Sequence, residues 1–274
     1  MNDVRAALVA AAQRLSSVSD TPRLDAELLM ARALGVTREV LLLSRLDGAV
    51  PVAFGALLAR RAAHEPVAYI TGVRDFWTIT LDVTPDVLIP RPDSETLIEA
   101  AIAHFGAAGP KTVLDLGTGS GALLLAALAQ WPEAVGLGVD ASEAALGVAS
   151  GNAQQLGFAN RAHFARGDWG QGIVDQFDLI LCNPPYVESG AALAPEVNNY
   201  EPHAALFAGN DGLADYRRLM PQLKTLMSPA AIAVLEIGAE QAAEVIALAR
   251  EAGLTATLYK DLAGRDRCLL IECR

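Results

Sequence analysis

The spacing of apolar residues divides the chain into a helical first part and a longer part in which strands and helices alternate. Apolar residues recur at helical spacing over 4–15 and 23–34, and Pro51 opens a third helical segment that continues to about His64. Gly35 directly follows the second segment, as a glycine that ends a helix does. These residues predict a small helical bundle without a cluster of catalytic side chains.

A short hairpin is expected to follow the bundle and to link it to a second domain. Apolar residues and threonine alternate over 76–81, which is typical of a strand. We therefore predict a helical domain over 1–68, a hairpin over 69–88 and a second domain over 89–274.

Beyond residue 111 the pattern is that of an α/β sheet. Predicted strands cover 112–116, 134–140, 162–165, 177–182 and 230–236, with a closing antiparallel hairpin over 255–260 and 268–273. Predicted helices cover 122–131, 142–156 and 96–105, and Asp93 or Ser94 can cap the last of these. This alternation favours a parallel sheet with helices on both faces. Ligands of such sheets bind beyond the carboxyl ends of the strands.

The first of these strands ends in a glycine-rich turn, Asp-Leu-Gly-Thr-Gly-Ser-Gly, which spans Asp115 to Gly121. Glycines let the backbone turn tightly and let a ligand approach it closely. The turn satisfies a dinucleotide-binding pattern, and Asp140 ends the second strand where an acid binds ribose hydroxyls. The motif by itself therefore fits NAD and S-adenosylmethionine alike, and Asp140 fits a helix cap as well.

Asp115 favours S-adenosylmethionine over NAD. A carboxylate at the mouth of the site repels a pyrophosphate but attracts a ligand that carries an ammonium and a sulfonium. After the third strand, Asp168 can accept a hydrogen bond from an adenine amino group, and Trp169 can cover the ring. The alternative for this pair is a surface turn with a packed tryptophan.

The fourth strand ends in Asn183-Pro184-Pro185-Tyr186, whose residue types suit the transfer of a methyl group to a planar nitrogen. Such a nitrogen is a poor nucleophile because its lone pair is delocalised, and acceptors on both of its hydrogens favour the pyramidal form that attacks. Asn183 offers a side-chain oxygen, Pro184 a backbone oxygen and Tyr186 a flat face. An amide and the exocyclic amine of adenine both meet this description.

Composition separates these two acceptors. The chain carries 32 acidic and 21 basic residues, a net charge of −11, whereas a grip on nucleic acid phosphates favours a basic excess. Three cysteines and four histidines show no spacing that suits a metal, so we expect no metal site. No apolar run approaches the roughly 18 residues of a membrane span, and the N-terminus lacks a signal-peptide pattern. We expect a cytoplasmic enzyme.

Nearly the whole chain resembles the bacterial peptide chain release factor glutamine methyltransferases, the PrmC/HemK family. The resemblance includes the glycine-rich turn, the motif at 183–186 and the segments 71–77, 89–95, 200–213, 236–241 and 261–267. Family members usually carry threonine where Ser94 stands, and threonine is also common at Ser120. Both are mild departures.

The resemblance implies a seven-stranded class I (Rossmann-like) methyltransferase domain, joined by a β-hairpin to a small helical domain that docks the release factor. It implies S-adenosylmethionine as cofactor and, as acceptor, the side-chain amide of the glutamine in the Gly-Gly-Gln motif of release factors 1 and 2. With the motifs, it assigns cofactor binding to Asp115, Gly117, Thr118, Gly119, Ser120, Gly121, Asp140, Asp168, Trp169 and Asn183. It assigns substrate binding to Arg91, Pro92, Asn183, Pro184, Pro185 and Tyr186, with Asn183, Pro184 and Tyr186 catalytic.

Two other acceptors stay open. A glutamine methyltransferase that acts on ribosomal protein uL3 would carry nearly the same motifs. An adenine-N6 methyltransferase carries a similar Asn/Asp-Pro-Pro-Tyr motif, but it must extract the base and grip the phosphate backbone. We expect a monomer that binds release factors and binds neither nucleic acid nor a membrane.

Overall fold

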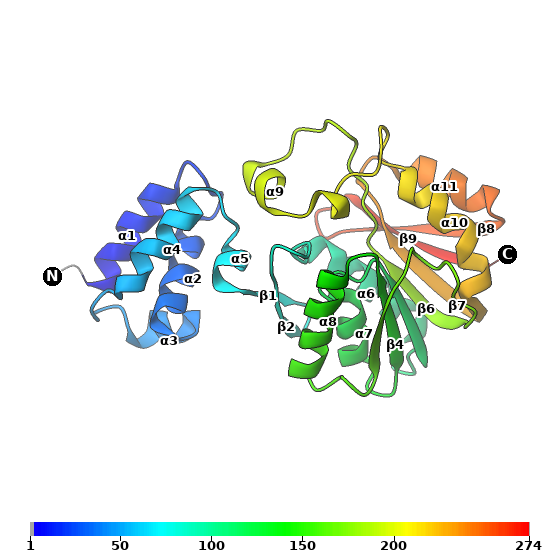
Figure 1. The fold of residues 1–274 in the computed structure, drawn as a ribbon, viewed down its shortest axis with the longest axis horizontal. Coiled ribbons are helices and arrows are strands. Elements are labelled where there is room, and N and C mark those ends of the chain that lie inside the picture. The colour runs from blue at the N-terminus through cyan, green and yellow to red at the C-terminus, as the bar shows by residue number, and fades with distance from the viewer. Residues whose placement is uncertain (1–2, 274) are drawn as a thin grey trace. The chain divides into compact units, whose positions relative to one another are not determined.

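The computed structural model describes residues 3–273, so what we expect of residues 1, 2 and 274 lies outside the described residues. The chain forms two compact units (Figure 1). A helical unit comprises residues 1–73 and 193–200, and a sheet unit comprises residues 74–192 and 201–274. Most of the hairpin that we expected as a linker lies in the sheet unit, and the helical unit includes a segment from far along the sequence.

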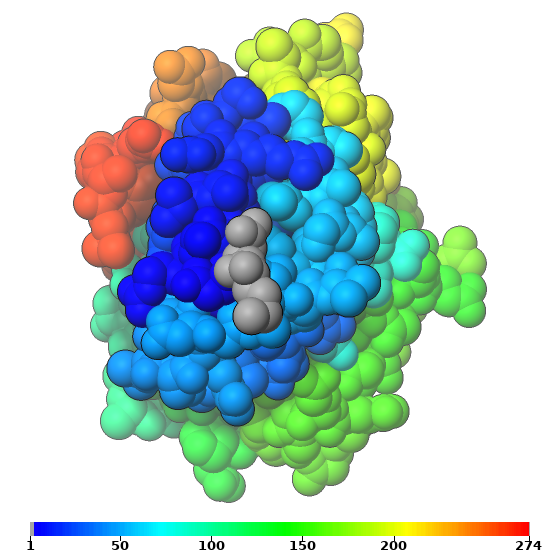
Figure 2. Space-filling model, turned by 90° about the vertical axis from the view of Figure 1, so that its left-hand side faces the viewer, coloured from blue at the N-terminus to red at the C-terminus, as the bar shows by residue number. Residues whose placement is uncertain are grey.

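The helical unit is built around the apolar faces of short helices. These are α1 (Val4–Leu15), α2 (Pro22–Leu34), α3 (Arg38–Ser44), α4 (Val52–Ala62) and α5 (Val67–Thr71). The unit also contains α9 (Pro195–Tyr200), none of whose residues is buried. Leu8 of α1, Leu29 of α2 and Phe54 of α4 are buried in one core. Gly35 follows α2 with a φ of 66°, as predicted, because glycine adopts the left-handed conformation without strain. Figure 2 shows the surface of the part of this unit within residues 3–73 in blue and cyan.

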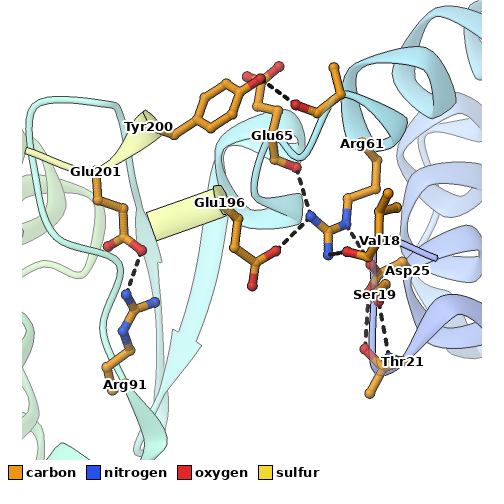
Figure 3. A network of polar contacts seen from close by, with 11 residues as sticks. Val18, Ser19, Thr21, Asp25, Arg61, Glu65, Arg91, Glu196, Tyr200 and Glu201 are labelled. Carbon is orange, nitrogen blue, oxygen red and sulfur yellow. Dashed lines mark hydrogen bonds and ion pairs between the residues drawn. The ribbon is translucent and has the colours of Figure 1, made fainter. Parts of the chain in front are cut away.

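A buried arginine ties α9 to the other helices of this unit (Figure 3). Arg61 of α4 donates hydrogen bonds to the carboxylates of Asp25 and Glu196, each at 2.7 Å. Its side chain is only 5% exposed, so these carboxylates replace water around its charge. The Tyr200 hydroxyl adds a hydrogen bond of 2.8 Å to the carbonyl of Ala63.

Replacing Arg61 with methionine is expected to lower the free energy of unfolding by about 2 kcal/mol, because the buried Asp25 carboxylate would lose its cation. Urea unfolding followed by circular dichroism measures this change. Arg5→Met is a matched control, since Arg5 pairs with Asp47 where the two side chains are 60% and 89% exposed. Equal losses in the two variants would contradict the importance of the buried pair.

The sheet unit contains a small hairpin and a seven-stranded sheet. The hairpin pairs β1 (Val73–Phe76) with β2 (Ile79–Asp82). The large sheet holds β3 (Thr112–Leu116), β4 (Val135–Asp140), β5 (Ala162–Arg166), β6 (Phe177–Cys182), β7 (Met227–Glu236), β8 (Leu254–Lys260) and β9 (Asp266–Cys273). Their order is β5-β4-β3-β6-β7-β9-β8; β9 runs antiparallel to both of its neighbours, and the other pairs are parallel. The predicted α/β fold is confirmed, although β7 begins at Met227 rather than at residue 230.

Helices cover both faces of the large sheet (Figure 1). One face packs against α6 (Glu95–Phe105), α7 (Ala122–Gln130) and α8 (Glu143–Gln155), and the other against α10 (Ala214–Leu226) and α11 (Ala242–Glu251). Successive strand residues point to opposite faces, so Val113 packs in the core beside α7 and Leu114 in the core beside α10. None of the helices within residues 3–273 has the length and hydropathy that crossing a bilayer requires.

The start of α6 differs from the expectation. Residues Pro92–Ser94 form a short 3-10 turn, η1, and the Ser94 side chain makes no capping hydrogen bond to the helix. It donates to Glu236 instead, and Asp93 pairs with Arg267 at 3.1 Å. Ser94 occupies the N-cap position of α6 as predicted, but its side chain does not cap the helix, because groups from the sheet take up the side chains of Asp93 and Ser94.

Candidate active site

A cavity of about 370 Å³ lies at the carboxyl ends of β3, β4, β5 and β6. The chain runs from β3 outward through β4 and β5, and then continues with β6 on the other side of β3. The strand order therefore reverses beside β3, and open α/β sheets bind their ligands at such a reversal. The volume of the cavity is within the range of small-molecule sites.

Most of the predicted site residues come together at this cavity. Those that line it are Asp115, Gly117, Thr118, Gly119, Ser120, Asp140, Asp168, Trp169, Asn183 and Pro185. Gly121, Arg91, Pro92, Pro184 and Tyr186 lie outside its lining. No group of three or more His, Cys, Asp or Glu side chains within residues 3–273 is arranged to hold a metal ion.

The glycine-rich turn is held against β4 by its own backbone. The N–H groups of Gly117 and Thr118 both donate to the Val139 carbonyl, at 2.8 and 3.0 Å. Gly117 has a φ of 75°, and a β-carbon on it would lie 3.1 Å from the Trp169 ring. Gly121 has a different role, because a β-carbon there would lie 3.0 Å from the side chain of Leu125 in α7. The third glycine thus serves helix packing, whereas the first makes room for the Trp169 ring.

Asp115 is buried rather than placed at the mouth of the site, and it is only 1% exposed. Its Oδ2 accepts hydrogen bonds from the Thr118 hydroxyl at 2.6 Å and from the Leu124 N–H at 3.3 Å. Its Oδ1 has no hydrogen-bond partner among the described residues. Burial, with a further contribution from the charge of Asp140, raises the pKa of Asp115 to about 7. A cation in the cavity would stabilise the charged form of Asp115 and so offset the cost of burying it.

Asp140 joins the glycine-rich turn to the start of α8. Its Oδ2 accepts from the Gly119 N–H and its Oδ1 from the Ser142 N–H, both at 2.9 Å. The N-cap of α8 is Ser142, whose hydroxyl accepts from the Ala145 N–H. Asp140 is therefore not the helix cap, and its two oxygens keep further lone pairs for a ligand.

The segment after β5 contributes Asp168 and Trp169 to the cavity wall. Trp169 has a positive φ of 53°, which turns the chain so that its ring reaches the glycine-rich turn. Asp168 is half-exposed and forms an ion pair with Arg218 of α10, which also lines the cavity. No motif in the sequence indicates Arg218, because this partner lies 50 residues from Asp168 along the chain.

The motif at residues 183–186 leaves β6 at the edge of the cavity. The side-chain nitrogen of Asn183 donates to the Ser94 hydroxyl at 3.2 Å, and the Tyr186 hydroxyl donates to Glu236 at 3.2 Å. Burial and the nearby carboxylate of Glu236 raise the pKa of Tyr186 above its usual range. The Gln241 side chain donates to the Tyr186 carbonyl at 3.0 Å. The motif is therefore held by three side chains from two other segments, none of which the sequence indicated as partners.

Arg91 is held in the segment that precedes η1. It pairs with Glu201, whose other carboxylate oxygen accepts from the Ile89 N–H at 3.1 Å. Glu201 precedes the second 3-10 turn, η2 (His203–Ala205), and only 4% of its surface is exposed. A buried carboxylate thus ties residues 89–91 to the start of the loop that leads into α10.

Solved structures of methyltransferases share this fold. The hMettl16 catalytic domain, in complex with MAT2A 3'UTR hairpin 6, matches with a TM-score of 0.59 at 19% identity, over 83% of this chain and 85% of that chain. A T. thermophilus 16S rRNA methyltransferase in complex with AdoMet and guanosine matches with a TM-score of 0.54 at 19% identity, over 74% and 50% of the two chains. At such identities the likeness shows the class I methyltransferase fold alone.

Family models match both parts of the chain. The PrmC N-terminal domain matches residues 6–72, and a methyltransferase domain matches residues 109–208. The release factor glutamine methyltransferase of Rhodospirillum rubrum is 45% identical over 93% of this chain and 80% of its own length. That of Caulobacter vibrioides is 42% identical over 96% of this chain and 94% of its own length. The chain is a methyltransferase, and it belongs to the family of release factor glutamine methyltransferases.

Proposed function

We propose that this enzyme methylates the side-chain amide nitrogen, N5, of the glutamine in the Gly-Gly-Gln motif of peptide chain release factors 1 and 2. We further propose S-adenosylmethionine as the methyl donor. The observation that carries the proposal is the motif at residues 183–186, which follows β6 at the cavity in a chain of this family.

The cavity carries groups that suit the charges of S-adenosylmethionine. The cofactor supplies a methyl group activated on a sulfonium, and its amino acid part brings an ammonium. Asp115, whose buried Oδ1 has no hydrogen-bond partner within residues 3–273, would accept a hydrogen bond from that ammonium. Asp140 would bind the ribose hydroxyls, and Trp169 would cover the adenine ring, with Asp168 as its acceptor. The glycine-rich turn would let the cofactor approach the backbone closely.

Asn183 and Pro184 would hold the acceptor amide. The Asn183 side-chain oxygen and the Pro184 carbonyl each accept one N–H of the glutamine, which orients its nitrogen and favours the pyramidal form. No strong base is needed before the transfer, because the nitrogen becomes acidic only as it gains the methyl group. Catalysis on this account is positioning and electrostatic stabilisation. Pro185 and Tyr186 would flank the amide.

We assign release factor docking to the helical unit, whose match to the PrmC N-terminal domain supports this role. Arg91 and Pro92 would order the substrate loop, since Arg91 is tied to the buried Glu201. We propose a monomer that acts in the cytoplasm and does not need nucleic acid. The acidic net charge of −11 supports a protein acceptor.

The decisive experiment incubates the enzyme with methyl-labelled S-adenosylmethionine and intact release factor 1 or 2. We expect label on the release factor and none on a variant whose Gly-Gly-Gln glutamine is replaced by alanine. Parallel reactions contain ribosomal protein uL3 and a DNA duplex. Label on only one of these, or on none of the acceptors, would refute the proposed acceptor.

Replacing Asp140 with alanine is expected to raise the Kd of S-adenosylmethionine about tenfold, because charge-assisted hydrogen bonds to the ribose are lost. Titration calorimetry measures this affinity. Glu143→Ala is a control of equal charge, since Glu143 is exposed in the first turn of α8. An unchanged Kd for Asp140→Ala would contradict the ribose assignment.

A further inference from the structure

A buried carboxylate at the end of β7 lies behind the motif at 183–186. Glu236 is only 1% exposed, and its two oxygens accept from the Ser94 hydroxyl at 2.5 Å and the Tyr186 hydroxyl at 3.2 Å. Its backbone carbonyl accepts from the Tyr216 hydroxyl at 2.8 Å. Glu236 does not line the cavity, so the proposed reaction leaves this costly buried group without a direct role.

Two hydroxyl groups and the charge of the Arg267 guanidinium together offset the negative charge of Glu236. Burial raises the pKa of this carboxyl, whereas the Ser94 hydroxyl, the Arg267 guanidinium and the Tyr186 hydroxyl lower it. Asp93 acts in the opposite direction to Arg267, with which it also forms an ion pair. Hydroxyl donors therefore hold Glu236, and both come from segments that adjoin the cavity.

The direction of these hydrogen bonds determines which way the nitrogen and the oxygen of the Asn183 side-chain amide point. A serine hydroxyl has a single hydrogen, and Ser94 donates it to Glu236. Towards Asn183 the Ser94 oxygen can then act only as an acceptor. It accepts from the Asn183 nitrogen at 3.2 Å, which directs the Asn183 carbonyl oxygen away from Ser94.

We propose that Glu236 and Ser94 are positioning residues that set the orientation of the Asn183 amide, so that its oxygen and not its nitrogen meets the substrate N–H. This inference rests on the proposed function and names a mechanism for it. Without the carboxylate, the Ser94 hydrogen is free to donate to the Asn183 oxygen. The amide would then turn its own N–H groups toward the substrate, where they repel the donor that the site has to hold.

The same geometry explains why a hydroxyl residue is needed at position 94. Alanine has no hydroxyl to connect Glu236 with Asn183, whereas threonine keeps the hydroxyl and adds only a methyl group. Ser94 is 3% exposed and lines the cavity, so its replacement changes the site without opening the core to solvent. Ser94→Thr is therefore the conservative variant that matches Ser94→Ala.

The test measures kcat, KM for the release factor and the Kd of S-adenosylmethionine for wild type, Ser94→Ala, Ser94→Thr and Glu236→Met. We expect Ser94→Ala and Glu236→Met to lower kcat at least about tenfold, with the cofactor Kd within about threefold. Ser94→Thr should keep kcat within about threefold. A double-mutant cycle adds Asn183→Ala, in whose background Ser94→Ala should cost less than about twofold, since the oriented group is already gone.

A merely structural role of Ser94 would lower kcat to the same extent with and without Asn183, and that result would overturn the proposal. So would an unchanged kcat in Ser94→Ala, or an equal loss in Ser94→Thr. If Glu236→Met does not fold, the Ser94 variants and the double-mutant cycle still test the proposal. Failure of the proposed function looks different, because the wild-type enzyme itself would then leave the release factor unlabelled.

Discussion

The Asn183→Ala variant is expected to lower kcat by about 100-fold or more, with a smaller change in the Kd of S-adenosylmethionine. Asn183 lines the cavity, and its nitrogen is already occupied by Ser94, so its oxygen is the group available to the substrate amide. Loss of one positioned polar group at a reacting centre has an effect of this size in other enzymes. The methyl donor keeps its other contacts, which is why turnover should suffer more than cofactor binding.

Steady-state transfer of labelled methyl groups to the release factor measures this effect, and calorimetry measures the cofactor Kd. Asn160→Ala serves as the control, because Asn160 is exposed in the turn before β5. A turnover within a few-fold of wild type would show that Asn183 is not the acceptor of the substrate N–H. A large rise in the cofactor Kd with little change in kcat would assign Asn183 to the cofactor instead.

The Asp115→Asn variant is expected to weaken S-adenosylmethionine binding by about 10- to 100-fold at neutral pH. The asparagine is close in shape, but it cannot offer a charged oxygen to an ammonium, and charge-assisted hydrogen bonds contribute about 1.5–3 kcal/mol. This prediction tests the Oδ1 of Asp115, which has no hydrogen-bond partner in the described part of the chain. Thr118→Ser is a suitable control, since it keeps the hydroxyl that donates to Asp115.

The dependence on pH gives this prediction a second readout. The pKa of Asp115 is raised from 3.8 to about 7 in the folded protein, so between these values the folded state binds more protons than the unfolded state. Ionisation of Asp115 therefore lowers the free energy of unfolding as the pH rises from about 4 through about 7. Asp115→Asn has no carboxyl group to ionise at this position, so its free energy of unfolding does not fall in this way. Without cofactor, the variant should therefore be more stable than wild type above pH 7 by about 1–3 kcal/mol.

Binding of the cofactor should show the opposite trend. An ammonium favours the ionised carboxylate, so the affinity of wild type for S-adenosylmethionine should rise as the pH approaches about 7, while that of Asp115→Asn stays nearly flat. Thermal unfolding and calorimetry across this range measure both effects. Parallel pH profiles for the two proteins would refute the assignment of Asp115 to the ammonium.

Much of the fold could be predicted because its determinants are local. The strands β3 and β6 have the predicted bounds, since each is a short apolar run that ends at a glycine-rich turn or at Asn183. Glycine and proline mark such ends through backbone geometry alone. The helices α10 and α11 were missed, and β7 begins three residues before residue 230, at Met227. The buried residues of α10 do recur at helical spacing, but Pro221 lies inside this helix, and an internal proline argues against a helix when only the sequence is considered.

The sequence by itself determined the fold class, the glycine-rich turn and the motif at 183–186, because each of these is a contiguous run whose chemistry can be read without knowing its neighbours. The tertiary structure alone decided which side chains meet. It buried Asp115, paired Arg61 with Glu196 and brought Ser94 to Glu236, which lies 142 residues away along the chain. Such partners leave no periodic signal, since the direction of a hydrogen bond depends on where folding places both groups.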